Sequence, residues 1–403
     1  MAGGRKRSTA KQARRDARRR KAQRGGASDR QTPEEAPLID EVREALEGQP
    51  IDLLGLVSTM ILATAPQELT SLRRRDPEDH ASLDELVAAF IDVQVPETTA
   101  LLVALGELVP GDDVLRARCR REVDARDESL PPWLAELAMT SVYRVVRMTH
   151  VLGDGDELLV GVRFADGQEM TCVVYIDHLT MSEVNDAFFV PDTINAVLEV
   201  GQASNNDPDT SFIETDLTEA RARLQNALDQ PLTMMPLEES DSWPAGRPLL
   251  QWLTQLMPVG TSTFELPQHD STLTGEVLGR FFASLVGLPF DDIDHRELLE
   301  ICIEEGTGDP LRWSAARLRE LLGAAVVYDN VMPLEVQLDA PELLRAFVPF
   351  AHAASGIRQE LTVEALAAID EAADDYRAMV IEDTEYWADR DDDDDDGTAS
   401  VLH

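Results

Sequence analysis

Three residues near the middle of the chain have side chains that could act together in acid–base chemistry: His150, Asp177 and His178. Histidine titrates near neutral pH, and a carboxylate beside it can orient the ring and stabilise its charged form. Asp177 and His178 follow a β-rich run, and neighbours on a strand point to opposite faces, so a break in the strand is needed before both act on one atom. The sequence therefore offers these three as candidate catalytic residues, with capping of a sheet edge as the structural alternative.

Other histidines and acidic residues do not complete a metal site. Asp292 and His295 are three residues apart on an expected helix, but two ligands do not make a site. His295-Arg296-Glu297 has the His-x-Glu spacing of zinc deaminases, whose Pro-Cys-x-x-Cys partner is absent. The run from Asp207 begins like a calcium loop but lacks the glycine at position six and the glutamate at position twelve. We predict no metal ion and no cofactor.

The distribution of lysine excludes several enzyme classes. The three lysines of the chain, Lys6, Lys11 and Lys21, all lie within the first 30 residues. The rest of the chain therefore has no lysine for a Walker A loop, for the ATP contact of a protein kinase, or for a Schiff base with pyridoxal phosphate. The sequence also lacks His-Glu-x-x-His and Gly-x-Ser-x-Gly.

Charge divides the chain into a basic beginning and an acidic body. The whole chain has a net charge of −40, yet residues 1–30 hold 12 Lys and Arg and 2 Asp. Such a segment attracts nucleic acid by releasing counterions, and without aromatic side chains it does not stack on bases. We therefore predict that residues 1–30 contact nucleic acid or another polyanion, the alternative being contact with the acidic body of the same chain. The residues predicted to make this contact are Arg5, Lys6, Arg7, Lys11, Arg14, Arg15, Arg18, Arg19, Arg20, Lys21 and Arg24.

Cysteine use and hydropathy indicate a cytoplasmic protein that does not enter a membrane. Cys119, Cys172 and Cys302 are odd in number and far apart, which does not make a disulfide framework. No apolar run reaches the length of a transmembrane helix, and the basic N-terminus has no apolar stretch of the kind found in a signal peptide.

The elements that would position the candidate site form a small sheet. Val142–Met148, Glu157–Phe164 and Glu169–Ile176 have the composition of three strands. Asp166-Gly167 suits a two-residue hairpin turn, and in that register Leu158 faces Tyr175. Both faces of the sheet are apolar, which predicts that helices cover both.

Almost all other segments have helical spacing, so we predict an α+β fold that is predominantly helical, with a small three-stranded antiparallel sheet at about residues 142–177. Thr180-Met181-Ser182-Glu183 is expected to cap a short helix after the sheet. The predicted organisation is a disordered basic tail at 1–30, a helical region at 31–139, the β-meander with short helices at 140–201, linkers with one helix at 202–247, a helical region at 248–388 and a disordered acidic tail at 389–403.

No complete catalytic constellation emerges from these patterns. We therefore expect a non-enzymatic cytoplasmic interaction protein that contacts a polyanion through residues 1–30, and that also offers surfaces to a protein partner. The alternative is a hydrolase or transferase with its site at the edge of the small sheet near His150, Asp177 and His178.

Overall fold

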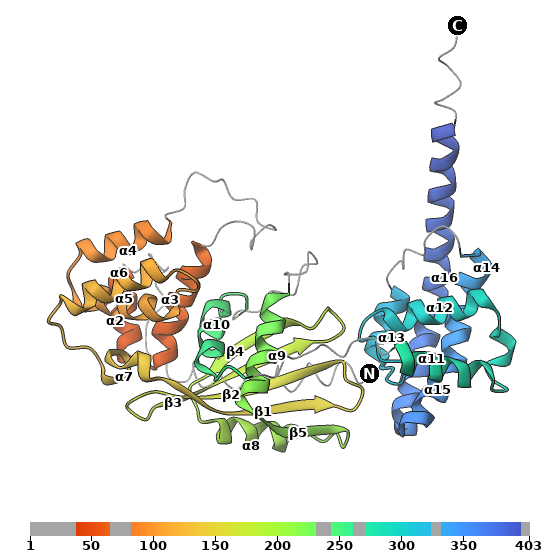
Figure 1. Cartoon of the computed structure of the whole chain (residues 1–403), viewed down its shortest axis with the longest axis horizontal. Helices are drawn as coiled ribbons and strands as arrows, with labels where there is room; N and C mark the ends of the chain where they lie inside the picture. Colours follow the sequence, from red (N-terminus) through yellow and green to blue (C-terminus); the bar gives the residue numbers. More distant parts are fainter. Residues whose placement is uncertain (1–37, 65–81, 231–242, 261–270, 324–331, 396–403) are drawn as a thin grey trace, which may run out of the picture. The chain divides into compact units, whose positions relative to one another are not determined.

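The computed structural model describes residues 38–64, 82–230, 243–260, 271–323 and 332–395, the last eleven of them by their backbone alone. These residues form two compact units that divide near residue 265, except that residues 150–154 group with the second unit. The sheet unit holds helices α2 to α10 and all the strands, and the helical unit holds α11 to α16 (Figure 1). The segment predicted to bind polyanions, residues 1–30, lies outside the described residues.

The described part of the sheet unit contains one five-stranded sheet with the order β4-β3-β2-β1-β5. The prediction of an α+β, mainly helical fold is confirmed, but the predicted strand number of three is too low. The strands are β1 (Ser141–His150), β2 (Gly155–Arg163), β3 (Glu169–Asp177), β4 (Glu183–Val190) and β5 (Thr210–Thr215).

The turn between β2 and β3 differs from the predicted one, and the register differs with it. Gly167 has a positive φ of 88°, and the amide of Phe164 donates to the carbonyl of Gln168 at 2.9 Å. The loop is thus three residues long, and only its last residue is left-handed. The predicted two-residue turn would have two left-handed residues. Leu158 consequently pairs with Val174, and the predicted pairing with Tyr175 is wrong by one residue.

Strand β4 lies where the sequence indicated a short helix, and that prediction is wrong. Val184 pairs with Ile176 and Phe188 with Val173, so β4 extends the hydrogen-bonded ladder of β3. The Ser-and-Glu capping signal is local, whereas pairing along a whole strand buries Val184 and Phe188, and the pairing wins. Strand β5 comes from the segment that the sequence indicated as a polar link.

Helices cover both faces of the sheet, as the apolar pattern predicted. One face packs on α9 (Leu217–Asp229) and α10 (Arg247–Leu256), and the other packs on α8 (Ile194–Ser204) (Figure 1). The valines in the middle of the sheet are buried on both faces, namely Val160, Val162, Val173 and Val174. The sheet is therefore an interior layer, and polar groups on it must find partners inside the protein.

The N-terminal helices of the sheet unit share the core that includes the α9 face of the sheet. Helix α5 is buried on most sides, and the others surround it. A capping box begins α4, with the amide of Glu85 donating to the Ser82 hydroxyl. The helices are α2 (Leu38–Glu47), α3 (Pro50–Ala63), α4 (Leu83–Asp92), α5 (Pro96–Leu108), α6 (Asp113–Asp124), α7 (Pro132–Ala135) and the 3-10 helix η2 (Leu137–Met139).

The helical unit has its own apolar core, centred on edge-to-face aromatic pairs. The rings of Phe281 and Phe347 lie 5.0 Å apart at 82°, and Trp313 meets Phe347 at 5.9 Å and 87°. Its elements are α11 (Ser271–Phe282), η3 (Leu288–Phe290), α12 (Ile293–Glu304), α13 (Ala315–Gly323), α14 (Leu334–Leu338), α15 (Ala340–Ser355) and α16 (Gln359–Asp395).

The last helix continues well past the predicted helix end. Helix α16 reaches Asp395, so it enters the range from 389 that the sequence indicated as a disordered tail. The chain contains neither proline nor glycine between Gly356 and Gly397, so nothing in the local sequence breaks the helix earlier. The remaining residues of that tail lie outside the described part of the chain.

Candidate functional site

A buried carboxylate, Asp156, marks the most chemically organised place in the sheet unit. Asp156 is 3% exposed and lies near the start of the central strand β2, between Thr149 of β1 and Ile176 of β3. Residues paired across an antiparallel sheet point to the same face, so the side chain lies on the α9 side with Leu158 and Val160. A charge at this position must be paired, because burying it alone costs several kcal/mol.

Asp156 is paired by a histidine and two arginines. His178 Nε2 lies 3.3 Å from Asp156 Oδ2, and the guanidinium groups of Arg147 and Arg223 each lie 3.3 Å from a carboxylate oxygen. Burial alone would raise the pKa of Asp156, but hydrogen bonds from His178 and Thr149, together with the charges of His178 and Arg147, lower it to about 2. The carboxylate is therefore ionised at neutral pH.

The imidazole of His178 joins this carboxylate to a serine. His178 Nδ1 lies 2.8 Å from Ser182 Oγ, on the side of the ring opposite Asp156. With Nε2–H donating to Asp156, the neutral ring accepts the Ser182 hydroxyl proton at Nδ1. Ser182, His178 and Asp156 thus form a hydroxyl–imidazole–carboxylate chain, the order of groups found in serine hydrolases.

The turn that carries Ser182 has an unusual backbone. Met181 and Ser182 join β3 to β4 with φ values of 56° and 60°, and the amide of Glu183 donates to the carbonyl of Thr180. Left-handed residues other than glycine cost roughly 1–2 kcal/mol each, and such residues are common at functional sites. The two adjacent left-handed residues direct the Ser182 side chain toward His178 at the end of the sheet.

The chain of groups can transfer a proton but is closed to solvent. Ser182 is 4% exposed, whereas Met181, its neighbour in the turn, is exposed. A substrate carbonyl therefore has no open path to the Ser182 hydroxyl in this conformation. Arg147 and Arg223 also hold Asp156 in place, so the same contacts fix the ends of β1, β2 and β3 and the position of α9.

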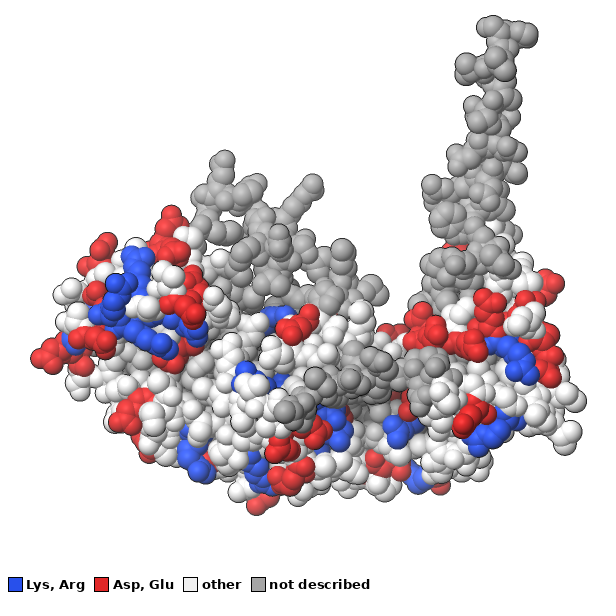
Figure 2. All heavy atoms as spheres, viewed as in Figure 1, with Lys and Arg blue, Asp and Glu red and all other residues white. Residues whose placement is uncertain are grey.

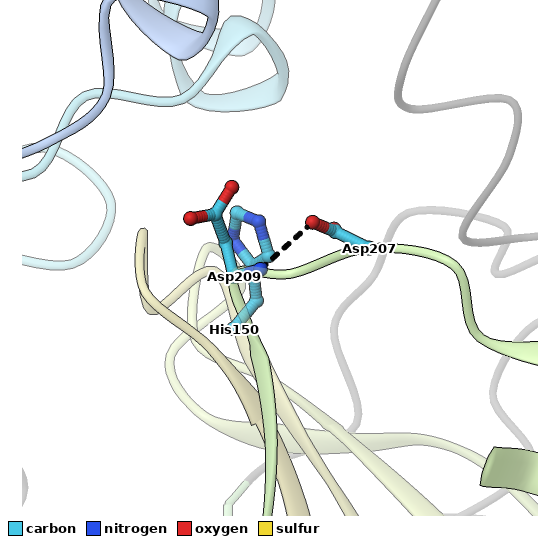
Figure 3. A group of neighbouring side chains, drawn as sticks. All are labelled: His150, Asp207 and Asp209. Atoms are coloured by element: carbon cyan, nitrogen blue, oxygen red, sulfur yellow. Dashed lines mark hydrogen bonds between the residues drawn. The ribbon is translucent and has the colours of Figure 1, made fainter.

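His150 lies in a different group of residues from His178. It ends β1, and its neighbours are Asp207 and Asp209, which precede the adjacent strand β5 (Figure 3). Ligand atoms of the three residues lie within 4.8 Å of one another, and the amide of Asp209 donates to Asp207 Oδ1. The sequence indicated Asp207 and Asp209 only as part of a failed calcium loop, and their proximity to His150 depends on strand order.

The protonation of His150 favours hydrogen bonding over metal ligation. The amide of Leu152 donates to His150 Nδ1 at 3.2 Å, so that nitrogen uses its lone pair as an acceptor. The proton of the neutral ring is then on Nε2, and a protonated nitrogen does not bind a metal. Histidine ligands usually show the reverse arrangement, in which the second nitrogen donates.

The structure does not bring the three sequence candidates together as one site. His178 joins Asp156 and Ser182, His150 joins the β5 edge, and Asp177 accepts a hydrogen bond from the amide of Leu179 in the turn. The candidates chosen from the sequence did not include Asp156, and Ser182 was expected to cap a helix. One available signal was the position of Asp156 next to the buried run Leu158–Val160.

The chain was compared with known protein families, curated proteins and solved structures. No family model, no curated protein and no solved structure matches this chain. Among the described residues, no helix is long and apolar enough to cross a membrane.

Proposed function

We propose that the protein is a non-enzymatic cytoplasmic interaction protein that contacts nucleic acid or another polyanion through residues 1–30. The supporting observation is that most arginines outside this segment are already paired. Of the twenty arginines whose side chains the structure describes, at least fifteen form ion pairs with carboxylates of the same chain. On the visible surface, blue and red side chains accordingly lie next to each other (Figure 2). The described part of the body therefore offers little free positive charge.

The charge of residues 1–30 has no equivalent elsewhere in the chain. These residues have a net charge of +10, and the remaining residues have a net charge of −50. A polyanion is repelled by such a body and attracted by such a segment. Because the segment has no aromatic side chain, contact with nucleic acid should be electrostatic and independent of base sequence. The three cysteines are free and buried, as suits a reducing compartment.

The test is fluorescence anisotropy with labelled single-stranded RNA of mixed sequence at several salt concentrations. If residues 1–30 neutralise about 6–10 phosphates, affinity should fall by roughly 10³–10⁵ between 50 and 200 mM salt. A variant without residues 1–30 should not bind, and a variant in which their twelve Lys and Arg are Gln is the matched control for chain length. Equal binding by either variant, or no binding by the full chain at 50 mM salt, contradicts the proposal.

The second candidate function is that of a hydrolase, and the observation that favours it is the chain from Ser182 through His178 to Asp156. In such a reaction, Ser182 Oγ attacks an acyl carbon while His178 Nδ1 takes the hydroxyl proton. The leaving alcohol or amine then receives that proton, and water hydrolyses the acyl-serine in the reverse sequence. Asp156 would stabilise the imidazolium that forms between the two steps.

An alkyl fluorophosphonate probe distinguishes the two functions, because it labels a serine that an adjacent base activates. The hydrolase predicts labelling of the full chain that is lost in Ser182→Ala and reduced in His178→Gln. Ser284→Ala changes a serine outside this chain of groups and serves as the control. A protein that resists labelling under conditions that label a known serine hydrolase excludes the hydrolase and leaves the first proposal standing.

A further inference from the structure

The segment between α11 and α12 exposes large apolar side chains close together in the chain. Leu285 is 91% exposed, Val286 52%, Leu288 61% and Ile293 74%. These four lie within nine residues, whereas most of the other exposed large apolar residues in the described chain are scattered singly. Single exposed apolar residues are ordinary, but a group of them rimmed by polar residues marks an interaction surface.

Hydrogen bonds hold this segment in a defined conformation. The amide of Leu288 donates to the carbonyl of Ser284 at 2.9 Å, and the amide of Phe290 donates to the carbonyl of Gly287 at 3.0 Å. The amide of Gly287 donates to the Ser284 hydroxyl. A side chain at Gly287 would place its Cβ 2.1 Å from the carbonyl oxygen of Phe281, so only glycine permits this close approach. The apolar side chains are thus presented by an ordered turn, which lowers the entropy lost when a partner binds.

The turn is anchored on the core of the helical unit. Phe281 and Phe282, at the end of α11, are buried, and the Arg296 guanidinium lies 4.4 Å from the centre of the Phe282 ring. Arg296 Nε also donates to Asp291 Oδ1 at 3.0 Å, which ties the start of α12 to the end of η3. The exposed apolar residues therefore belong to one rigid part of the unit.

Acidic side chains surround the apolar residues. Between residues 285 and 297 the chain contains Asp291, Asp292, Asp294 and Glu297, against the single cation Arg296. Arg296 is engaged with Asp291, and His295 lies between Asp292 at 2.7 Å and Asp339 at 3.4 Å. The four carboxylates and Arg296 have a formal net charge of −3, and this acidic rim favours a partner that brings positive charge.

We propose that Leu285, Val286, Leu288 and Ile293, named here the apolar turn, dock a basic amphipathic segment of a partner protein. Apolar anchors of that segment would cover the turn while its Arg and Lys face the acidic rim. The chain's own residues 1–30 have the charge but no large apolar side chain beyond Met1, so they do not fill the surface. A second copy would bring the same negative rim, and an anionic membrane would be repelled in the same way. This surface is separate from the proposed polyanion contact.

The probe is a labelled amphipathic helical peptide of about 18 residues, or five helical turns, with Leu on one face and Arg on the other. A scrambled peptide of the same composition controls for plain attraction to the acidic body. With the full chain in fluorescence anisotropy, the amphipathic peptide should bind at least tenfold more tightly than the scrambled one. Deletion of residues 1–30 should leave this difference unchanged, so the result does not depend on the polyanion proposal.

Variants then locate the site. Leu285→Ser combined with Leu288→Ser should weaken binding of the amphipathic peptide at least tenfold, while Val363→Ser, an exposed apolar position on α16, should change it less than twofold. Glu297→Gln should weaken it about twofold through the loss of one rim charge. Both serine variants should keep the melting temperature of the parent, because the changed side chains are exposed.

Three outcomes would overturn the docking proposal. The first is equal binding of the scrambled and amphipathic peptides. The second is concentration-dependent dimerisation in analytical ultracentrifugation that the Leu285 and Leu288 changes abolish, which would assign the surface to a second copy. The third is binding to phosphatidylserine vesicles that the same changes abolish, which would assign it to a membrane.

Discussion

The two units bury a charged side chain in physically different ways. In the sheet unit, Asp156 is surrounded by groups of opposite charge, namely Arg147, His178 and Arg223. In the helical unit, Arg317 is buried among neutral carbonyls: it donates to Ile303 and Asp309 at 2.7 Å, to Arg312 at 3.0 Å and to Glu305 at 3.2 Å. No carboxylate oxygen among the described residues lies within ion-pairing distance of Arg317.

This difference determines how each of the two buried charges responds to pH. Asp156 is itself a titrating group with a pKa of about 2, whereas the carbonyls around Arg317 carry fixed dipoles that no pH change alters. Burial lowers the pKa of Arg317 to about 10, which leaves it charged throughout the physiological range. Arg317 also lies over the Trp313 ring at 4.0 Å and caps the last carbonyls of α12. It acts as a structural element of the helical unit, while Asp156 belongs to a group of residues able to transfer a proton.

The largest effect is expected from Arg317→Ala. The change removes the donors to several buried carbonyls and leaves a cavity beside Trp313, so the free energy of unfolding of the helical unit should fall by about 3–5 kcal/mol. The loss should be the same at pH 5.5 and pH 8.5, because no partner titrates. Urea unfolding followed by circular dichroism measures it, with Arg319→Ala, an exposed ion-paired position, as the control at under about 1 kcal/mol. A loss that depends on pH would show that a titrating group contributes to the burial of Arg317.

Asp156→Asn should be the next most disruptive change. It removes the buried carboxylate that Arg147 and Arg223 share, although Arg223 keeps Glu219 at 2.9 Å, and the expected loss is about 2–4 kcal/mol at pH 7. Since the folded-state pKa of Asp156 is about 2 and the ordinary value is 3.8, its contribution is present above about pH 4 and is lost as pH falls through 2. The variant should therefore show a flatter acid limb between pH 4 and pH 2 in thermal unfolding, and an unchanged acid limb would refute the assignment.

His352 provides a pH-dependent element of the helical unit. The amide of Trp313 donates to His352 Nε2 at 3.2 Å, and burial lowers the pKa of the ring to about 4 from 6.5. The unfolded chain then binds more protons between these values, so stability is present above about pH 6.5 and should decline by roughly 2–3 kcal/mol as pH falls toward 4. His352→Gln should abolish that slope in urea titrations at pH 4.5, 5.5, 6.5 and 7.5. A slope that persists in the variant would assign the pH dependence to other groups.

The smallest effect is expected from Glu157→Gln. This change should stabilise the sheet unit, whereas Asp156→Asn should destabilise it. Burial and then the neighbouring Asp186 raise the pKa of Glu157 to about 7 from 4.5. The folded state keeps the proton longer, so stability is fully present below about pH 4.5 and is lost as pH rises through 7. Glu157→Gln should stabilise the sheet unit by about 1 kcal/mol at pH 8 and leave it nearly unchanged at pH 5. Differential scanning calorimetry at both pH values tests this, and equal shifts at the two would contradict it.

Much of the fold could be predicted from local patterns. The helix at Ser82, the β-rich runs and the burial of both sheet faces follow from capping chemistry and the period of apolar residues, which depend on neighbours in the sequence. The register of β2 on β3 did not follow, because the dipeptide Asp166-Gly167 occurs in both two-residue and three-residue turns. The choice between these depends on which pairing buries more apolar surface.

The candidate site was less accessible to sequence reasoning than the fold. His178 was named from its position at a strand end, but Asp156 is 22 residues earlier and Ser182 lies in a turn whose sequence indicated a helix cap. Only the order of strands brings Asp156 beside His178, and only the left-handed backbone at Met181 and Ser182 turns the hydroxyl toward Nδ1. Neither is encoded by spacing alone.

The sequence by itself determined the segregation of charge, the absence of lysine after residue 21 and the mainly helical class, because these depend on composition and on short-range periodicity. The tertiary structure decided which strands pair, which carboxylate meets which histidine, and which apolar residues remain outside the core. Those outcomes depend on contacts between residues far apart in the chain. Their free energies are set by burial and by the pairing of buried charges, which no local pattern contains.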